Sequence, residues 1–344
     1  MATPTDTASL EGAPALSFVR TIDRSLVHRA AVSEVLVTDL VRTGAEDFVA
    51  GAQLPHGHAY FSDHARTPVT YDFLLLLEAA RQAGTAASHR QLGIPGDTTF
   101  LVNSWSIRIE EVQGLTPGDR PAELELAGAV TPVTARNGRL RGVSSSVTLR
   151  IADRVVARTR IDVGMAKGSD YGKLRFLQRK STPPLTSELH GVLRSRPVDA
   201  ARVGRRNPAN VVLGEPTHHG DTVSAQVEPQ FDNRSLFDHT YDHIPAVVLT
   251  EAARQLAHLA GVPTSATVTG CAADFTRFAE LDIPLVATAR LDPASHTGVS
   301  PVRCVVDFQQ DGSEAGRITL DFTPAPSAAG PVPTSGRAHR TEAS

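Results

Sequence analysis

Hydrophobic and polar positions divide the chain into two similar halves. In each half an apolar run passes into the same five-residue word, Glu-Ala-Ala-Arg-Gln, at residues 78–82 and again at residues 251–255. Each run predicts a helix that turns from apolar to polar at the glutamate. The first helix, over about residues 70–92, is followed by Gly93, and the second is followed by Gly261, as expected of helix ends. The spacing of 173 residues between the words predicts a duplicated domain.

Alternation of apolar and polar positions predicts strands around both helices. In the first half one strand precedes the helix and four follow it, over residues 47–54, 99–112, 122–134, 140–151 and 155–163. In the second half two precede the helix and four follow it, over residues 210–213, 222–229, 266–278, 284–291, 302–309 and 317–322. The 173-residue offset places Trp105 on Phe278, inside the strand that follows each helix. A helix followed by a meander of strands therefore occurs twice.

A long central helix wrapped by an antiparallel meander is the hot-dog fold. We therefore expect an α+β protein with a tandem (double) hot-dog fold, in which the two repeats pair within one chain. The groove beside such a helix is apolar along most of its length and polar at one end, which suits an acyl thioester. The expected organisation is a disordered leader (1–16), an N-terminal repeat (17–165), a basic linker (166–208), a C-terminal repeat (209–324) and a disordered tail (325–344).

Composition narrows the class of protein. Of the 344 residues, 41% are apolar and 21% are charged, which is typical of a soluble globular protein, and the net charge of −3 predicts no general affinity for nucleic acid or membrane. No apolar run approaches the length of a membrane span, so we expect a cytoplasmic protein. Cys271 and Cys304 are too few for a disulfide scaffold or a cysteine-based zinc site.

The segment between the repeats is locally basic. Between residues 167 and 206 there are ten Lys and Arg residues and three acidic residues. Two interpretations remain open: a solvated linker that crosses the surface, or a basic face for an acidic partner or a phosphorylated substrate.

The repeated helix word carries a carboxylate and a guanidinium on one face. Residues three apart lie one above the other on a helix, so Glu78 is expected beside Arg81 and Glu251 beside Arg254. On a buried helix these groups would have to pair or to face a cavity, because an unpaired buried charge is costly. The pattern is compatible with an ordinary ion pair or with a functional pair. The presence of two copies in matching apolar settings leaves both interpretations open.

Two histidines stand in the loop before the second helix, and each follows an aspartate. The spacing of His239 and His243 resembles a metal-ligand pair, but Pro245 places them in a loop, so we expect no metal site. The imidazoles are either fixed structurally by the aspartates, or one of them points into the groove and polarises a thioester carbonyl or moves a proton. Motifs for covalent catalysis, nucleotide binding and cofactor binding are absent from the sequence.

Several of these motifs together resemble the A-factor biosynthesis (AfsA) family. They are the run Leu-Val-His-Arg-Ala-Ala-Val-Ser-Glu-Val at 26–35, the two helix words, the loop Asp-His-x-x-Asp-His-Ile-Pro at 238–245 and the word Arg-Phe-x-Glu-Leu-Asp at 277–282. The resemblance covers about residues 17–323. It implies an acyltransferase that condenses a β-ketoacyl thioester, bound to acyl carrier protein or coenzyme A, with dihydroxyacetone phosphate, forming the precursor of a γ-butyrolactone-type or butenolide signalling molecule.

The resemblance also implies which residues act. The catalytic residues would be those of the two helix words, Glu78, Arg81, Glu251 and Arg254. A glutamate can take the proton of the attacking hydroxyl, and an arginine can hold the phosphate or the carbonyl oxygen that gains charge. The expected substrate-binding residues are His243, His239, Arg277, His28 and Arg29. No cofactor is expected, and a homodimer is compatible with the fold.

The two halves depart from the family pattern to different degrees. Tyr71-Asp72-Phe73 stands where the family pattern has His-Asp-Pro, and Ala246 stands where a glycine is expected. Because Glu251 follows the full Asp-His loop, we expect the second repeat to hold the better-formed site. The alternatives are a hot-dog thioesterase or β-hydroxyacyl dehydratase that uses His243 with Glu251, and a non-catalytic acyl-binding regulatory module.

Overall fold

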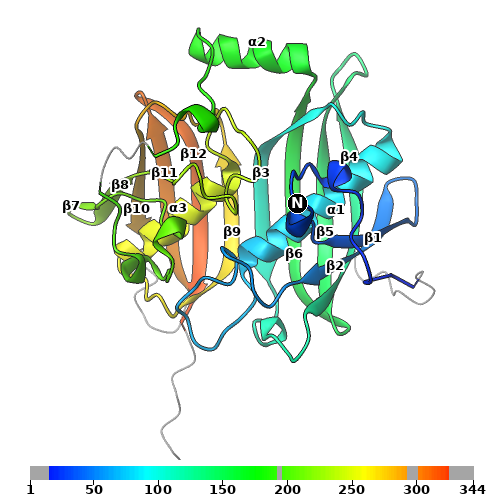
Figure 1. Cartoon of the computed structure of the whole chain (residues 1–344), viewed down its shortest axis with the longest axis horizontal. Helices are drawn as coiled ribbons and strands as arrows, with labels where there is room; N and C mark the ends of the chain where they lie inside the picture. Colours follow the sequence, from blue (N-terminus) through cyan, green and yellow to red (C-terminus); the bar gives the residue numbers. More distant parts are fainter. Residues whose placement is uncertain (1–14, 192–195, 293–300, 325–344) are drawn as a thin grey trace, which may run out of the picture.

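A computed structural model describes residues 15–191, 196–292 and 301–324. Their strands form a single 12-stranded antiparallel sheet. In spatial order the first half consists of β1 (Val37–Arg42), β2 (Asp47–Leu54), β4 (Ala122–Thr134), β5 (Leu140–Ile151), β6 (Arg154–Ala166) and β3 (Thr99–Ile109). The second half consists of β9 (Thr267–Phe275), β12 (Ser313–Thr323), β11 (Val302–Gln310), β10 (Leu285–Leu291), β8 (Thr222–Gln226) and β7 (Thr217–His219). The halves meet where β3 pairs with β9 (Figure 1).

One long helix lies across the strands of each half (Figure 1). In the first half α1 (Phe73–Leu92) begins at Asp72, whose carboxylate accepts a hydrogen bond from the Leu74 amide, and ends at Gly93 in the left-handed conformation. In the second half α3 (Ala246–Leu259) begins after Pro245. Both helices bury their apolar residues against the sheet. The predicted tandem hot-dog fold is confirmed, with the two repeats joined within one chain.

The predicted equivalence of Trp105 and Phe278 is wrong. Because α1 has 20 residues and α3 has 14, the number of residues that separates equivalent positions of the two halves becomes smaller after the helices. The following strands begin at Thr99 and Thr267, so Trp105 corresponds to Ala273, with which it is also paired across the sheet. Phe278 lies beyond the end of β9.

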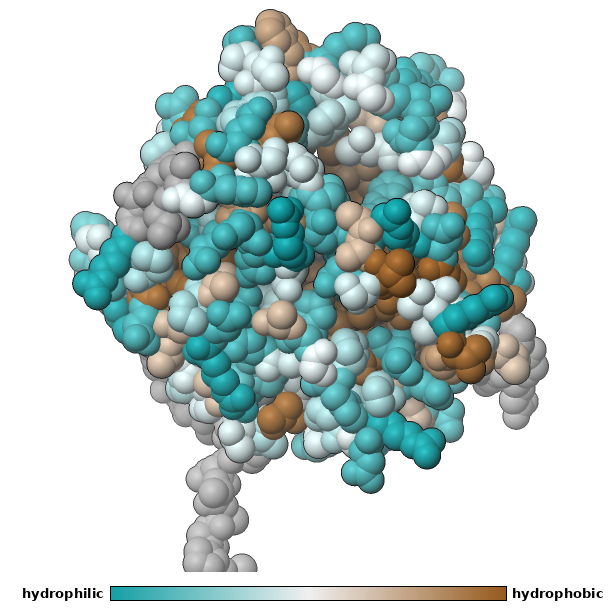
Figure 2. Space-filling view, viewed as in Figure 1, coloured by the Kyte–Doolittle hydropathy of each residue, from teal (hydrophilic) through white to brown (hydrophobic). Residues whose placement is uncertain are grey.

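Two further predictions of local structure differ from the structure. The strand expected at 210–213 is replaced by the short 3-10 helix η6 (Pro208–Asn210) and one isolated bridge at Leu213. The segment expected as a linker contains a regular helix, α2 (Gly168–Arg179), which projects at the top of Figure 1. Its apolar residues Leu174, Phe176 and Leu177 are exposed. On the mainly hydrophilic face in Figure 2, a hydrophobic area appears over α2.

The repeat also extends back into the predicted linker. Near the start of the chain η1 (Arg24–Val27) is capped by an aspartate, ends at a left-handed residue and leads into Arg29. The same sequence of features occurs in η5 (Ala200–Val203), which leads into Arg205. The same capped turn and arginine therefore precede both halves, and in the second half they stand before residue 209. The remaining 3-10 helices are η2 (Val32–Glu34), η3 (Gln113–Leu115) and η4 (Thr186–Glu188).

None of the described helices combines the length and the hydrophobicity needed to span a bilayer. The predicted tail, and the predicted leader up to residue 14, lie outside the described residues.

Candidate functional site

A pocket of about 1120 Å³ lies where the two repeats meet. Its apolar walls come from both halves and include Phe100, Val102, Trp105, Val163, Val247, Leu249 and Phe275. Its polar lining also comes from both halves and includes His28, Arg29, Glu78, Arg81, His239, Asp242, His243 and Arg277. Seven of the nine residues predicted to act or to bind substrate are thus brought together, and the two that are not are Glu251 and Arg254.

Glu78 is the centre of a charged network at the pocket wall. Its carboxylate accepts hydrogen bonds from Arg81 Nε at 2.8 Å and from Gln82 Nε2 at 2.7 Å, and it lies 2.6 Å from Arg29 Nη2. Burial alone would raise the pKa of Glu78, but the charges of Arg29 and Arg81 outweigh it and hold this pKa well below its ordinary value. The carboxylate is therefore firmly ionised. It is suited to anchoring two arginines and poorly suited to taking a proton.

The Asp-His loop of the second repeat packs against this first-repeat network. Asp238 Oδ2 accepts a hydrogen bond from the Ala30 amide at 2.7 Å, and Asp238 Oδ1 lies 3.4 Å from Arg29 Nη1. The prediction that this loop forms one site with Glu251 is wrong, since the loop crosses the interface to face Glu78. Sequence order placed the loop before α3, whereas packing of the two repeats places it over α1.

Both histidines of the loop are oriented by their neighbouring aspartates. His239 Nδ1 lies 2.5 Å from Asp238, and His243 Nδ1 lies 2.6 Å from Asp242. These contacts assign the Nδ1 proton, which leaves the lone pair of a neutral imidazole on Nε2. Among the described residues, none is hydrogen-bonded to either Nε2. Each ring lines the pocket and can therefore accept a proton there.

His28 and Arg277 differ in charge at the pocket wall. His28 has a left-handed backbone, with φ 55°, and its Nε2 lies 2.8 Å from Nε2 of His89. Burial, and then the charges of neighbouring groups including Arg81, lower the pKa of His28 to about 4, so this imidazole is neutral at pH 7. Arg277 is exposed, and within the described parts of the chain its guanidinium forms no ion pair. Arg277 is thus better suited than His28 to meet an anion.

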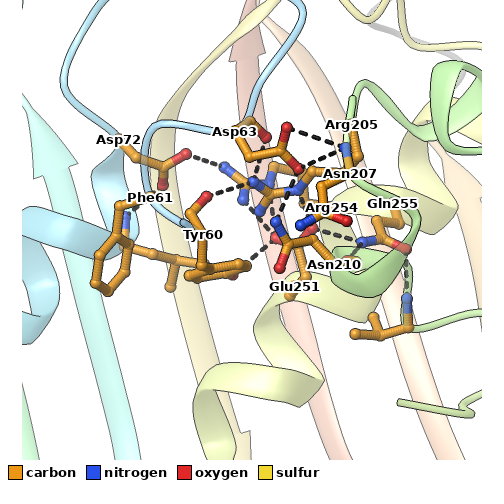
Figure 3. A network of polar contacts seen from close by, with 12 residues as sticks. Tyr60, Phe61, Asp63, Asp72, Arg205, Asn207, Asn210, Glu251, Arg254 and Gln255 are labelled. Atoms are coloured by element: carbon orange, nitrogen blue, oxygen red, sulfur yellow. Dashed lines mark hydrogen bonds and ion pairs between the residues drawn. The ribbon is translucent and has the colours of Figure 1, made fainter. Parts of the chain in front are cut away.

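The second helix word forms a closed network (Figure 3). Glu251 has no exposed surface, and its carboxylate accepts hydrogen bonds from Arg205 at 2.8 Å, from Gln255 at 2.6 Å and from the Tyr60 hydroxyl at 3.0 Å. It also pairs with Arg254. Burial raises the pKa of Glu251, but Arg205 and Arg254 outweigh it and lower this pKa to about 2.

Residues of the first repeat cover the second network. The Tyr60 ring is fully buried, and the Arg205 guanidinium lies 4.5 Å from its centroid. Asp72, in the word that departs from the family pattern, contacts Arg254 Nη1 at 2.5 Å. The expectation that the second repeat holds the better-formed site is therefore reversed. The closed site leaves no surface through which Glu251 could reach a substrate.

Sequence reasoning missed Tyr60, Asp72 and Arg205 as parts of this network. A signal was available for one of them, because Val27-His28-Arg29 recurs as Val203-Gly204-Arg205 at an offset of 176 residues. Both arginines pair with the glutamate of their own helix word. No comparable signal marked Tyr60, whose role depends on a contact across the interface. Among the described residues, no group of three His, Cys, Asp or Glu side chains is arranged to hold a metal ion.

Comparison with known proteins identifies the family of the chain. The protein-family model described as the A-factor biosynthesis hotdog domain matches residues 11–166 and 192–326. A 2-oxo-3-(phosphooxy)propyl 3-oxoalkanoate synthase of Streptomyces virginiae is 35% identical over 299 residues, which cover 85% of this chain and 94% of the relative. A synthase of the same name from Streptomyces coelicolor is 29% identical, covering 87% of this chain and 90% of the relative.

Solved structures support the fold. A protein described as an oleoyl thioesterase from Lactobacillus plantarum matches with a TM-score of 0.50 and 11% identity, over 83% of this chain and 98% of its own. A polyketide synthase dehydratase domain from Brevibacillus brevis matches with a TM-score of 0.50 and 13% identity, over 83% of this chain and 97% of its own. The match of the family model to both repeats, together with the Streptomyces virginiae relative, shows that the chain belongs to the A-factor biosynthesis family of hotdog proteins.

Proposed function

We propose that this protein is an acyltransferase that moves a β-ketoacyl group from a thioester to the hydroxyl of dihydroxyacetone phosphate. The product would be the ester that precedes a γ-butyrolactone-type signalling molecule. The names of the relatives describe such an ester, since a 3-oxoalkanoate is joined to a phosphorylated three-carbon ketone. The observation that carries the proposal is the pocket between the repeats, which is lined by apolar side chains of both halves together with arginines and histidines.

The pocket suits both substrates. Its apolar walls can hold the acyl chain, because an alkyl chain gains free energy on leaving water. Arg277 is the candidate for binding the phosphate. Arg29 and Arg81, anchored by Glu78, are the candidates for stabilising the thioester oxygen as it gains negative charge. The thioester could be carried by acyl carrier protein or by coenzyme A.

The Asp-His pairs supply the proton transfer. We assign His243 as the general base, with Nε2 taking the hydroxyl proton while the hydroxyl oxygen attacks the thioester carbon. When the tetrahedral intermediate collapses, the carbon–sulfur bond breaks and the imidazolium returns the proton to the departing thiolate. This assignment gives Glu78 the role of anchoring arginines, in place of the proton-accepting role expected from the resemblance, because its pKa is held low.

The experiment is to incubate the purified protein with a β-ketoacyl thioester and dihydroxyacetone phosphate, and to follow the phosphorylated ester and its cyclised product by mass spectrometry. We expect thiol release to depend on dihydroxyacetone phosphate. Parallel reactions with acyl carrier protein and coenzyme A thioesters identify the donor. Thiol release that is independent of the acceptor would instead indicate a thioesterase. Absence of any ester while the thioester survives would contradict acyl transfer.

A further inference from the structure

Helix α2 is bound firmly to the second repeat through Arg175. This side chain is buried, and its Nε donates to Asp242 Oδ2 at 3.0 Å while Nη2 donates to the Asp242 carbonyl at 2.9 Å. Nη1 and Nη2 also contact Glu280 at 2.9 and 2.7 Å. One turn earlier, the Tyr171 hydroxyl lies 2.7 and 2.8 Å from the two oxygens of Asp242. The segment expected as a solvated linker therefore places two donors on one active-site carboxylate.

Those contacts determine how Asp242 can act on His243. One carboxylate oxygen accepts the Nδ1–H of His243, and the other accepts from Arg175. With Tyr171 bridging both oxygens, the carboxylate cannot rotate without breaking several hydrogen bonds. The imidazole is thereby held in one tautomer and one orientation, as in other sites where an outer partner orients a histidine.

The Asp242–His243 pair is also a feature that the open site has and the closed one lacks. Counting back from the starts of α1 and α3, the corresponding residues of the first repeat are Val69 and Thr70. The other pair, Asp238–His239, has a counterpart in Asp63–His64 by its contacts rather than by this count, since both aspartates accept a backbone amide from the residue after the repeated arginine. An Asp-His pair beside the repeated arginine therefore occurs at both sites, whereas the Asp242–His243 pair occurs at the open site alone.

We propose that Tyr171 and Arg175 are positioning residues for proton transfer, holding Asp242 so that Nε2 of His243 faces the reacting hydroxyl. This inference rests on the proposed function, since it assigns the residues that support the base of that reaction. It gives α2 a part in the active site that neither its sequence nor its place between the repeats indicates.

Charge around the pair sets the expected pH dependence. Asp242 faces Tyr171, Arg175 and His243, and Arg175 shares Glu280 with Arg179. Arg29 and Asp238 form a separate ion pair, in the neighbouring contact between the loop and the first repeat. Removing a donor from Asp242 leaves its negative charge less compensated, so the His243 imidazolium releases its proton less readily. The acid limb of the kcat/KM profile should then move to higher pH.

The first test uses Tyr171→Phe, which removes one hydroxyl and keeps the ring against Phe278. We expect kcat for dihydroxyacetone phosphate-dependent transfer to fall about tenfold, the lower end of the range seen for outer partners of metal-ligating histidines, with KM for the acceptor nearly unchanged. Arg175→Gln should lower kcat further, by about 100-fold, which is the upper end of the same range. Both variants should move the acid limb to higher pH.

A matched control is Arg179→Gln on the same helix, since Arg179 pairs with Glu280 and Asp282 but does not contact Asp242. Its profile should keep the wild-type shape. The proposal is overturned if folded Tyr171→Phe retains the wild-type kcat and pH profile, or if Arg179→Gln shifts the profile equally. If Arg175→Gln does not fold, Tyr171→Phe alone decides.

A second measurement does not depend on the reaction. The Nδ1–H proton of His243, assigned by its disappearance in His243→Ala, should give a downfield NMR resonance that moves in Tyr171→Phe and not in Arg179→Gln. If the wild-type protein forms no ester but this resonance behaves as expected, the proposed reaction fails while the positioning contact stands. If the ester forms and neither the resonance nor the profile responds to Tyr171→Phe, the positioning proposal fails alone.

Discussion

The glutamates of the two central helices have the same kinds of partner in different surroundings. On α1, Glu78 contacts Arg29, Arg81 and Gln82 at the wall of a pocket of about 1120 Å³. On α3, Glu251 contacts Arg205, Arg254 and Gln255 and has no exposed surface. The local bonds are nearly the same. In both networks the glutamine amide nitrogen donates to the glutamate and to a backbone carbonyl, and its oxygen accepts a backbone amide.

The difference lies in what packs over each network. Histidines and open space face Glu78, while Tyr60 and Asp72 lie against Glu251 and Arg254. A glutamate that anchors two arginines can therefore serve either a site or a core. Which role it has depends on whether a substrate can reach the arginines. Three experiments test this contrast, in order of decreasing expected effect.

The largest expected effect is the loss of stability in Arg254→Met. This change leaves Glu251 with one arginine, and leaves the fully buried Asp72 with Arg66 at 3.7 Å. Breaking a buried ion pair from one side costs about 3–5 kcal/mol, so the urea midpoint should fall markedly. The matched change Arg81→Met should cost less, because Arg81 is partly exposed and Glu78 keeps Arg29. Equal losses would mean that both networks are structural in the same way.

The next effect is on activity. Glu78→Gln should lower kcat/KM for acyl transfer about 100-fold, comparable with losing one donor to a developing oxyanion, because Arg29 and Arg81 lose their charged anchor. Glu251→Gln, assayed where it remains folded, should stay within about threefold of the wild type, since it is remote from the charge that develops. A folded Glu251→Gln protein that is as inactive as Glu78→Gln would restore a catalytic role for the second network.

The smallest effect concerns acid stability. Because the pKa of Glu251 is lowered from 4.5 to about 2, its contribution to stability is present above pH 4.5 and is lost as the pH falls through 2. Over that range one such carboxylate changes the free energy of unfolding by about 1.4 kcal/mol per pH unit. Urea unfolding at pH 5, 4 and 3 should show the wild type and Glu251→Gln converging. A constant gap would indicate that Glu251 is not held ionised by Arg205 and Arg254.

Much of the fold and part of the site could be predicted. The two central helices and the strands that follow them were anticipated because their signals are local: an apolar run, a glycine stop and alternating apolar positions. Arg29, Arg81 and His243, which line the pocket, could be singled out because they stand in recognisable motifs. Helix α2 escaped prediction because its key residue, Arg175, is a buried cation that the sequence presents as one charge in a basic segment.

The sequence by itself determined that this protein is a duplicated hot-dog chain with a glutamate and an arginine on each central helix. Only the tertiary structure decided which helix faces a pocket. The deciding contacts join residues far apart in the chain: Arg29 and Asp238 are separated by 209 positions, and Tyr60 and Glu251 by 191. Local patterns specify elements. Whether a buried charge becomes a site or a core contact depends on which distant segment packs over it, and neither segment carries that information alone.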